Sequence, residues 1–86
     1  MQSFIELYRM DSGKEVLMIT KGQIEGIVLC RWSRGVGIEF VTWKIYRHND
    51  WNATAHGRYF PFSIKDEALQ YEKARNDFFA RGMSIK

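Results

Sequence analysis

The segment that most constrains the fold is the run from residue 36 to residue 47, VGIEFVTWKIYR. Branched and aromatic side chains dominate this run, and such side chains favour the pleated, half-buried surface of a β-strand. Successive side chains of a strand point to opposite faces, so Val41, Trp43 and Ile45 are expected together on one apolar face. The other face is expected to mix aromatic and polar groups: Phe40, Thr42, Lys44 and Tyr46. We therefore predict a central strand around which the rest of the chain is arranged.

Four further segments have the composition of strands and are separated by short turns that contain glycine or polar residues. They are Ser3–Met10, Glu15–Thr20, Ile24–Trp32 and Thr54–Phe62. Short connections favour antiparallel pairing of strands that follow each other in sequence, which gives a meander. Gly26, inside a strand segment, indicates a bulge or the close approach of another backbone. Pro61 cannot donate to a neighbouring strand, so the last segment ends there or lies at a sheet edge.

After the last strand the hydrophobic period changes to about 3.6 residues, which predicts an amphipathic helix over Ile64–Arg81. Ser63 and Asp66 have the spacing of a capping box at its start, and Gly82 ends it. Its apolar side consists of Ile64, Ala68, Tyr71, Ala74, Phe78 and Phe79. The sequence thus predicts an α+β fold in a single domain of residues 1–86, with four to five strands in an antiparallel meander and one C-terminal helix packed across one face.

The predicted helix and the central strand match in length, so we expect Phe78 and Tyr71 to dock on the face of Val41, Trp43 and Ile45. One helix covers only part of such a sheet. The remaining face is then solvated or covered by a partner, and a second copy of the chain is the commonest partner for it. The sequence therefore predicts a homodimer that forms through an aromatic face of the sheet.

Arg75 lies near the centre of the apolar side of the predicted helix. A charge at this position must be paired or must extend to water. Glu39 is a candidate partner, since it shares a strand face with apolar residues. Extension of the long side chain to water is the commoner arrangement, and we prefer it here.

Composition and charge exclude few functions. The 86 residues include 13 Lys and Arg against 10 Asp and Glu, a net charge of +3, which permits nucleic acid as a partner without requiring it. Cys30 is the only cysteine, so the chain lacks the disulfide framework of a small secreted domain. No stretch approaches the roughly 18 apolar residues that a membrane span needs. With no signal peptide recognised, we expect a cytoplasmic protein that does not contact membranes.

The residue types that act as nucleophile and base do not form a recognisable constellation in this sequence. Cys30 lies in an apolar run, which is typical of an inert buried thiol. His48 and His56 flank a turn with Asp50, so a small hydrolase or nuclease built on these three residues is one alternative. The phosphate-binding, redox and hydrolase motifs GxxxxGKS, GxGxxG, CxxC and GxSxG are absent, and no segment identifies a family. We expect no enzyme activity, metal or cofactor.

The most suggestive group combines basic and aromatic side chains around the central strand. It comprises Trp32, Phe40, Lys44, Tyr46, Arg47, Trp51 and Arg58. Tyr, Trp and Arg are enriched in protein interfaces, so the first hypothesis is a small non-enzymatic binding module that associates with itself or with another protein. Aromatic residues interleaved with Arg and Lys also stack bases and hold phosphates. A protein that binds single-stranded nucleic acid is therefore a further alternative.

Overall fold

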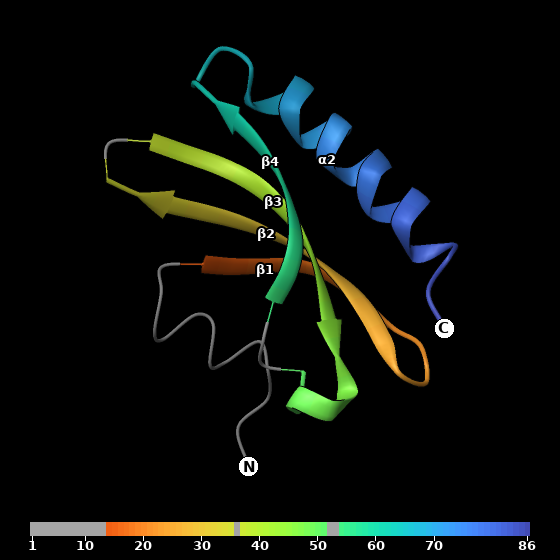
Figure 1. Cartoon of the computed structure of the whole chain (residues 1–86). Helices are drawn as coiled ribbons and strands as arrows, with labels where there is room; N and C mark the ends of the chain where they lie inside the picture. The colour runs from red at the N-terminus through yellow and green to blue at the C-terminus, as the bar shows by residue number, and fades with distance from the viewer. Residues whose placement is uncertain (1–13, 36, 52–53) are drawn as a thin grey trace.

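The computed structural model describes residues 14–35, 37–51 and 54–86, and the strand expected at Ser3–Met10 lies outside these ranges. Its elements are β1 (Lys14–Lys21), β2 (Glu25–Arg34), β3 (Gly37–Tyr46), the 3-10 helix η1 (Arg47–Asn49), β4 (Thr54–Phe62) and α2 (Glu67–Gly82). The described strands form one antiparallel sheet in the order β1-β2-β3-β4, and α2 runs across one of its faces (Figure 1). The predicted α+β meander with a C-terminal helix is confirmed.

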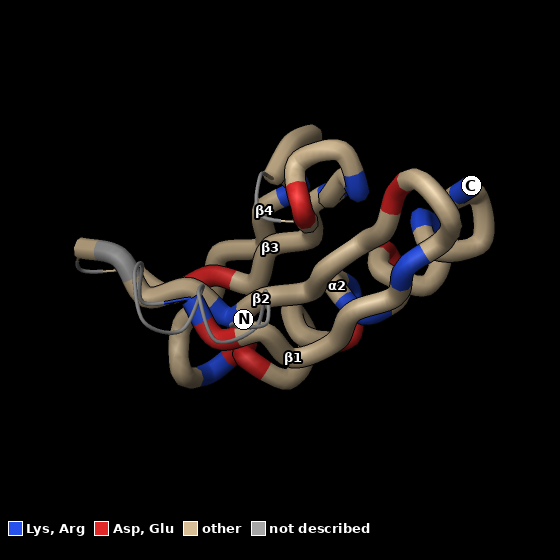
Figure 2. Tube along the Cα trace, turned by 90° about the horizontal axis from the view of Figure 1, so that it is seen from below, with Lys and Arg blue, Asp and Glu red and all other residues tan. Residues whose placement is uncertain are grey.

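Charged residues of both signs are spread along the chain. Figure 2 shows basic and acidic positions interspersed over the described strands and helix rather than gathered on one side. Within the described residues, no helix is both long enough and apolar enough to cross a membrane.

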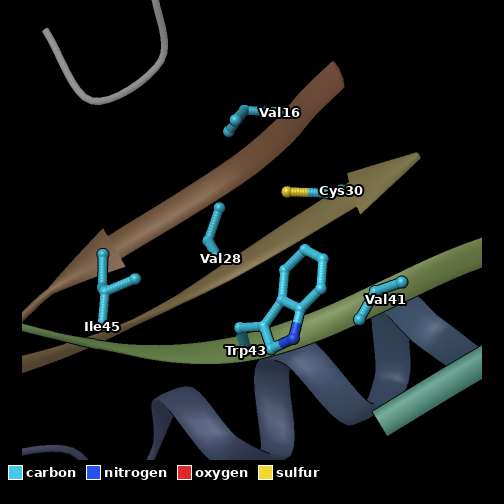
Figure 3. Close-up of a cluster of buried hydrophobic side chains, with 6 residues drawn as sticks. All are labelled: Val16, Val28, Cys30, Val41, Trp43 and Ile45. Carbon is cyan, nitrogen blue, oxygen red and sulfur yellow. The ribbon is translucent and has the colours of Figure 1, made fainter. Parts of the chain in front are cut away.

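The alternation in β3 divides the core into two clusters, one on each face of the sheet. The first, here named the tryptophan face, consists of Val16, Val28, Cys30, Val41, Trp43 and Ile45 (Figure 3). The second, here named the helix face, consists of Ile27, Leu29, Phe40, Ala74 and Phe78. The grouping of Val41, Trp43 and Ile45 is therefore as predicted, because the period of two is a property of the strand itself.

The helix docks on the opposite face from the one predicted. Phe78 packs with Ile27, Leu29 and Phe40, and the ring centroids of Tyr71 and Phe40 are 5.4 Å apart. The predicted contact of Phe78 with the tryptophan face is wrong. Strand β2 supplies buried aliphatic side chains to both faces, so the alternation shows which residues lie together but not which group meets the helix.

The tryptophan face does not present an open aromatic surface. Trp43 is only 5% exposed, and Val28, Cys30, Val41 and Ile45 are fully buried. Trp32 packs at its edge with a ring-centroid distance of 5.5 Å to Trp43. The sequence predicts the open aromatic surface on the other face, that of Phe40, and the structure places α2 on that face, where Phe40 is buried.

Strand β1, at one edge of the described sheet, contains a bulge. Its register with β2 shifts between Val16 and Met18, and as a result Leu17 and Met18 both pack against the helix-face cluster. A bulge in an edge strand increases the local twist and hinders pairing with another strand. At the other end of β1, a Cβ on Gly26 would lie 2.5 Å from the carbonyl oxygen of Thr20, which confirms the predicted close approach of another backbone.

Strand β4, at the other edge, contains Pro61 and a second bulge. The position of Pro61 in an edge strand is as predicted from its missing N–H. Opposite Trp43, β4 has two residues, His56 and Gly57. The φ of His56 is +52°, in the left-handed region. A Cβ on Gly57 would lie 2.5 Å from Nε1 of Trp43, so the indole fits only against glycine.

Helix α2 begins at Glu67, three residues later than predicted. The backbone N–H and the hydroxyl of Ser63 both donate to Oδ1 of Asp66, at 2.6 and 3.0 Å. These hydrogen bonds, that of the N–H first, lower the pKa of Asp66 below its ordinary value of 3.8. The predicted pair is thus in contact, but it closes a turn that precedes the helix. Ile64 lies in this turn and is 95% exposed, so it is not part of the core.

Candidate functional site

The side of α2 that faces the sheet differs from the side on which its apolar residues are centred. Its buried residues are Ala74, Phe78 and Arg81. On a helical wheel of 100° per residue, the mean direction of these three buried residues differs by roughly 65° from the mean direction of the residues predicted to form the apolar side. Ala68 and Phe79 belong to the apolar side and are nevertheless exposed. Part of the apolar side of the helix is thus left outside the core.

A polar network at the C-terminal half of α2 explains this rotation. Arg81 donates from Nη1 to Oγ1 and the carbonyl oxygen of Thr42, at 2.9 and 3.1 Å, and from Nη2 to the carbonyl oxygen of His56 at 2.7 Å. The Thr42 hydroxyl donates to Oδ2 of Asp77 at 2.6 Å, and Arg58 forms an ion pair with the same carboxylate. The network holds one polar side of α2 against β3 and β4, and so turns the apolar side toward β1.

This network is not predicted from the sequence. Arg81 is 9% exposed, and burial lowers the pKa of its guanidinium while Asp77 raises it. The local signal was the spacing of four residues between Asp77 and Arg81, whose charged groups lie 4.0 Å apart. The partners in the sheet, however, are separated from the helix by 35 and 39 residues, so no local pattern connects them.

An apolar groove opens between the N-terminal half of α2 and strands β1 to β3. Its volume is about 520 Å³. Its apolar walls are Leu17 of β1, Phe40 of β3, Ala68 and Tyr71 of α2, and Ile64 of the preceding turn. The groove lies where the rotation of α2 has left apolar side chains uncovered.

An ion pair borders this groove. Nε of Arg31 lies 3.8 Å from Oε2 of Glu67, and the two side chains are 33% and 46% exposed. The guanidinium of Arg31 also lies 5.6 Å from the ring centroid of Phe62. The groove thus combines apolar walls with one acid and one base that remain accessible to a ligand.

A second, smaller hollow follows the same side of α2 toward its C-terminus. It has a volume of about 210 Å³ and is bordered by Thr20 of β1 and by Phe79 and Met83, both of which are exposed. Because both hollows are bounded by β1, the uncovered apolar surface extends along one side of the helix.

Arg75 lies on this side of the helix and extends to solvent, with its guanidinium 5.3 Å from the ring centroid of Phe79. Glu39 shares the tryptophan face with Val41 and is buried there, on the other side of the sheet. The ion pair considered between Arg75 and Glu39 is therefore not formed, and the preferred extension to water is confirmed.

The predicted basic and aromatic residues are distributed over both faces of the sheet. Trp32 and Trp51 pack against the tryptophan face, where the ammonium groups of Lys14 and Lys21 lie 4.6 and 5.1 Å from their respective ring centroids. Phe40 is buried beneath α2 on the other face. Of the predicted group, only Phe40 lines the groove.

The remaining four predicted residues contact other parts of the chain. Nζ of Lys44 lies 3.9 Å from Oε2 of Glu25, and Arg58 is paired with Asp77 as described above. The ring of Tyr46 lies 5.5 Å from that of His48, and Arg47 donates to the carbonyl oxygen of Gln23 at 3.4 Å. The seven predicted residues therefore do not form one continuous surface.

The candidate catalytic residues also lie apart from the groove. Burial raises the pKa of the Cys30 thiol to about 12, against a smaller opposite effect of Lys14, and so keeps the thiol protonated. His48 packs on Tyr46 after β3, and His56 lies in the bulge of β4. In the described ranges, no three His, Cys, Asp or Glu side chains are placed to hold a metal ion.

No protein-family model, curated protein or solved structure matches this chain. The function is therefore inferred from the geometry described above.

Proposed function

We propose that this protein is a small, non-enzymatic binding module that recognises a protein partner through the groove between α2 and β1. The observation that carries the proposal is the open apolar hollow of about 520 Å³ beside Ile64, which is itself 95% exposed. Exposed apolar patches with a polar rim are typical of interaction sites.

Ile64 provides a thermodynamic reason for a partner at this place. The full burial of such a side chain contributes about 1.5–3 kcal/mol. Ala68 is small and exposed, so the backbone of a partner can approach the helix closely at this point. A protein that covers Ile64 and Ala68 therefore gains binding energy without any change in the fold.

The form of the sheet favours insertion of side chains over addition of a strand. The described sheet has a bulge in each edge strand, at Leu17 in β1 and at His56 and Gly57 in β4, and β4 also contains Pro61. These features hinder the pairing of an edge with another strand. We therefore expect the partner to place large apolar side chains in the groove.

The experiment is a selection from a random peptide library on the immobilised protein at low density. Ala68→Arg places a long charged side chain in the groove. Ala80→Arg makes the same change at an exposed position of α2 outside the groove and is the matched control. We expect the wild type and Ala80→Arg to enrich the same peptides, rich in large apolar residues, and Ala68→Arg to lose them. Equal capture by Ala68→Arg, or no enrichment by the wild type, would contradict the proposal.

The two alternative functions have weaker support. For nucleic acid, Arg58 and Lys44 lie close to the acids Asp77 and Glu25, which offset the charge available to phosphates. For a hydrolase or nuclease, the described part of the chain offers no cluster around His48, Asp50 or His56 of the kind a metal needs. A cytoplasmic location remains part of the proposal, and the free, buried thiol of Cys30 is compatible with a reducing compartment.

A further inference from the structure

We infer that the partner seated in the groove is a second copy of this chain, related to the first by a two-fold axis, an inference that rests on the proposed function. A two-fold interface uses the same patch on both subunits, so this patch must contain both a projecting group and a hollow that receives it. Ile64 projects into solvent and lies directly beside the hollow between Leu17, Phe40 and Tyr71. The patch therefore has the self-complementary shape that such an interface requires.

The projecting group is held in place before any partner binds. The N–H and the hydroxyl of Ser63 both bond to the Asp66 carboxylate, and the N–H of Asp66 returns to the carbonyl oxygen of Ser63 at 3.2 Å. These three contacts close the turn that presents Ile64. A fixed turn loses less conformational entropy on association than a free one, and this favours binding.

The ion pair at the border of the groove provides complementary charges. Glu67 follows Ile64 by three residues, so the entry of Ile64 into the other copy brings Glu67 toward the Arg31 of that copy. The two side chains are 33% and 46% exposed, so both charged groups remain accessible to the other copy. In the dimer each Arg31 then faces a Glu67 of the other copy, and such pairs fix the relative orientation of two subunits.

An interface of standard size would occupy only a small part of the surface of this chain. A standard interface buries about 800 Å² per partner, a small part of the 5635 Å² of this chain. The molecule is flat, with extents of 38 × 28 × 16 Å. Exposed apolar residues continue along this side of α2 from Ile64 to Phe79 and Met83. A partner seated on the groove can thus extend its contacts along the helix.

The first test is the oligomeric state of the full chain by sedimentation equilibrium, from about 1 µM to 1 mM, the range of weak to moderate interfaces. The wild type is expected to form dimers. Ile64→Glu is expected to weaken association at least about a hundredfold, because each dimer loses two buried isoleucine side chains. Ile24→Glu makes the same change at another exposed isoleucine, which does not line the groove, and should leave the dimer intact. Circular dichroism verifies that both variants are folded.

A wild-type monomer over this whole range would overturn the inference. If that monomer still enriched library peptides and Ala68→Arg did not, the protein-binding function would stand without the second copy. Equal dimerisation of Ile64→Glu and Ile24→Glu would also overturn the inference, because the interface would then lie elsewhere.

The second test exchanges the charges at the border of the groove. Arg31→Glu and Glu67→Arg each place like charges opposite one another in a homodimer, so each variant alone should be monomeric. A mixture of the two variants brings opposite charges together at both sites and should restore a dimer with one copy of each. From the net charge of +3, Arg31→Glu gives +1 and Glu67→Arg gives +5. Both variants are thus positive, so their net charges do not attract each other, and at about 0.15 M salt the repulsion is screened over about 8 Å. No recovery on mixing would overturn the two-fold arrangement.

Discussion

Arg81 donates a hydrogen bond of 2.7 Å from Nη2 to the carbonyl oxygen of His56 and so connects the end of α2 to the bulge of β4. His56 has a φ of +52°, which a non-glycine residue adopts only at some energetic cost. The same guanidinium bonds to Thr42 in the centre of the sheet. One buried side chain therefore fixes the position of the helix, and with it the orientation that leaves the groove open.

Replacement of Arg81 is expected to be strongly destabilising. Arg81→Met keeps much of the length of the side chain but leaves the buried carbonyl oxygen of Thr42 and the partly buried carbonyl oxygen of His56 without this donor. We expect a loss of about 3–5 kcal/mol in the free energy of unfolding, measured by urea denaturation. Arg75→Met, on the exposed side of the same helix, should cost no more than about 1 kcal/mol. Equal effects of the two changes would contradict the role of Arg81.

The strain at His56 leads to a prediction with a defined sign. Glycine adopts a positive φ without steric penalty, so His56→Gly should remove a strain of about 1–2 kcal/mol from the folded state. Glycine also makes the unfolded chain more flexible, and this opposes the gain by about 0.5–1 kcal/mol. We expect a net gain of about 0.5–1 kcal/mol in thermal melts. His56→Ala keeps the strained φ and should not be stabilised. If the alanine variant were the more stable of the two, the assigned backbone conformation would be wrong.

The elements of this fold could be predicted from the sequence because they depend on local periods. The bounds of β4, Thr54–Phe62, agree with the prediction, and the partners of Trp43 on its face follow from strict alternation. The choice of face for α2 could not be predicted. Ile27 and Leu29 point to one side and Val28 and Cys30 to the other, and all four are fully buried, so polarity does not separate the faces.

The candidate site was less predictable, because it arises from the rotation of the helix. The spacing of Ile64, Ala68 and Tyr71 places all three on the apolar side of the helix and predicts that they belong to the core. The contacts of Thr42 with Asp77 and Arg81 turn that side away from the sheet, and these contacts join residues that are distant in sequence. The sequence does contain one indication of the groove: the apolar side of the helix is wider than the part of a helix that can contact a sheet.

Gly57 is expected to tolerate no side chain. Besides its contact with Nε1 of Trp43, a Cβ there would lie 2.8 Å from the Tyr59 hydroxyl. Gly57→Ala should therefore lower the free energy of unfolding by about 1–3 kcal/mol, as overpacking does. Gly37→Ala is the control, since its Cβ would meet no atom within 4 Å. Urea denaturation followed by tryptophan fluorescence compares the two, and a Gly57→Ala protein as stable as Gly37→Ala would exclude the close packing of Trp43.

The hydrogen bonds of Ser63 to Asp66 predict a pH dependence. The pKa of Asp66 is lowered in the folded state, so the stabilisation by its carboxylate is present above the ordinary value of 3.8 and is lost as the pH falls through the lower, folded-state pKa. Ser63→Ala removes the hydroxyl donor but keeps the N–H donor. The pKa of Asp66, followed by NMR titration, should therefore rise in this variant and still remain below 3.8. An unchanged pKa would show that the hydroxyl does not contribute.

Phe78 provides the direct test of how the helix docks. Its ring is 4% exposed and packs with Ile27, Leu29 and Phe40 on the helix face. Phe78→Ala should lower the free energy of unfolding by about 3–5 kcal/mol, as the deletion of a buried ring does.

A domain of this size has a total stability of only about 5 kcal/mol or slightly more, so this variant should be close to unfolded. Lys73→Ala, on the exposed side of α2, should change the stability by less than about 0.5 kcal/mol. Urea melts of both variants measure the difference. A Phe78→Ala protein that melts like the wild type would mean that α2 is not held to the sheet by this ring, and the groove beside it would then have no fixed wall.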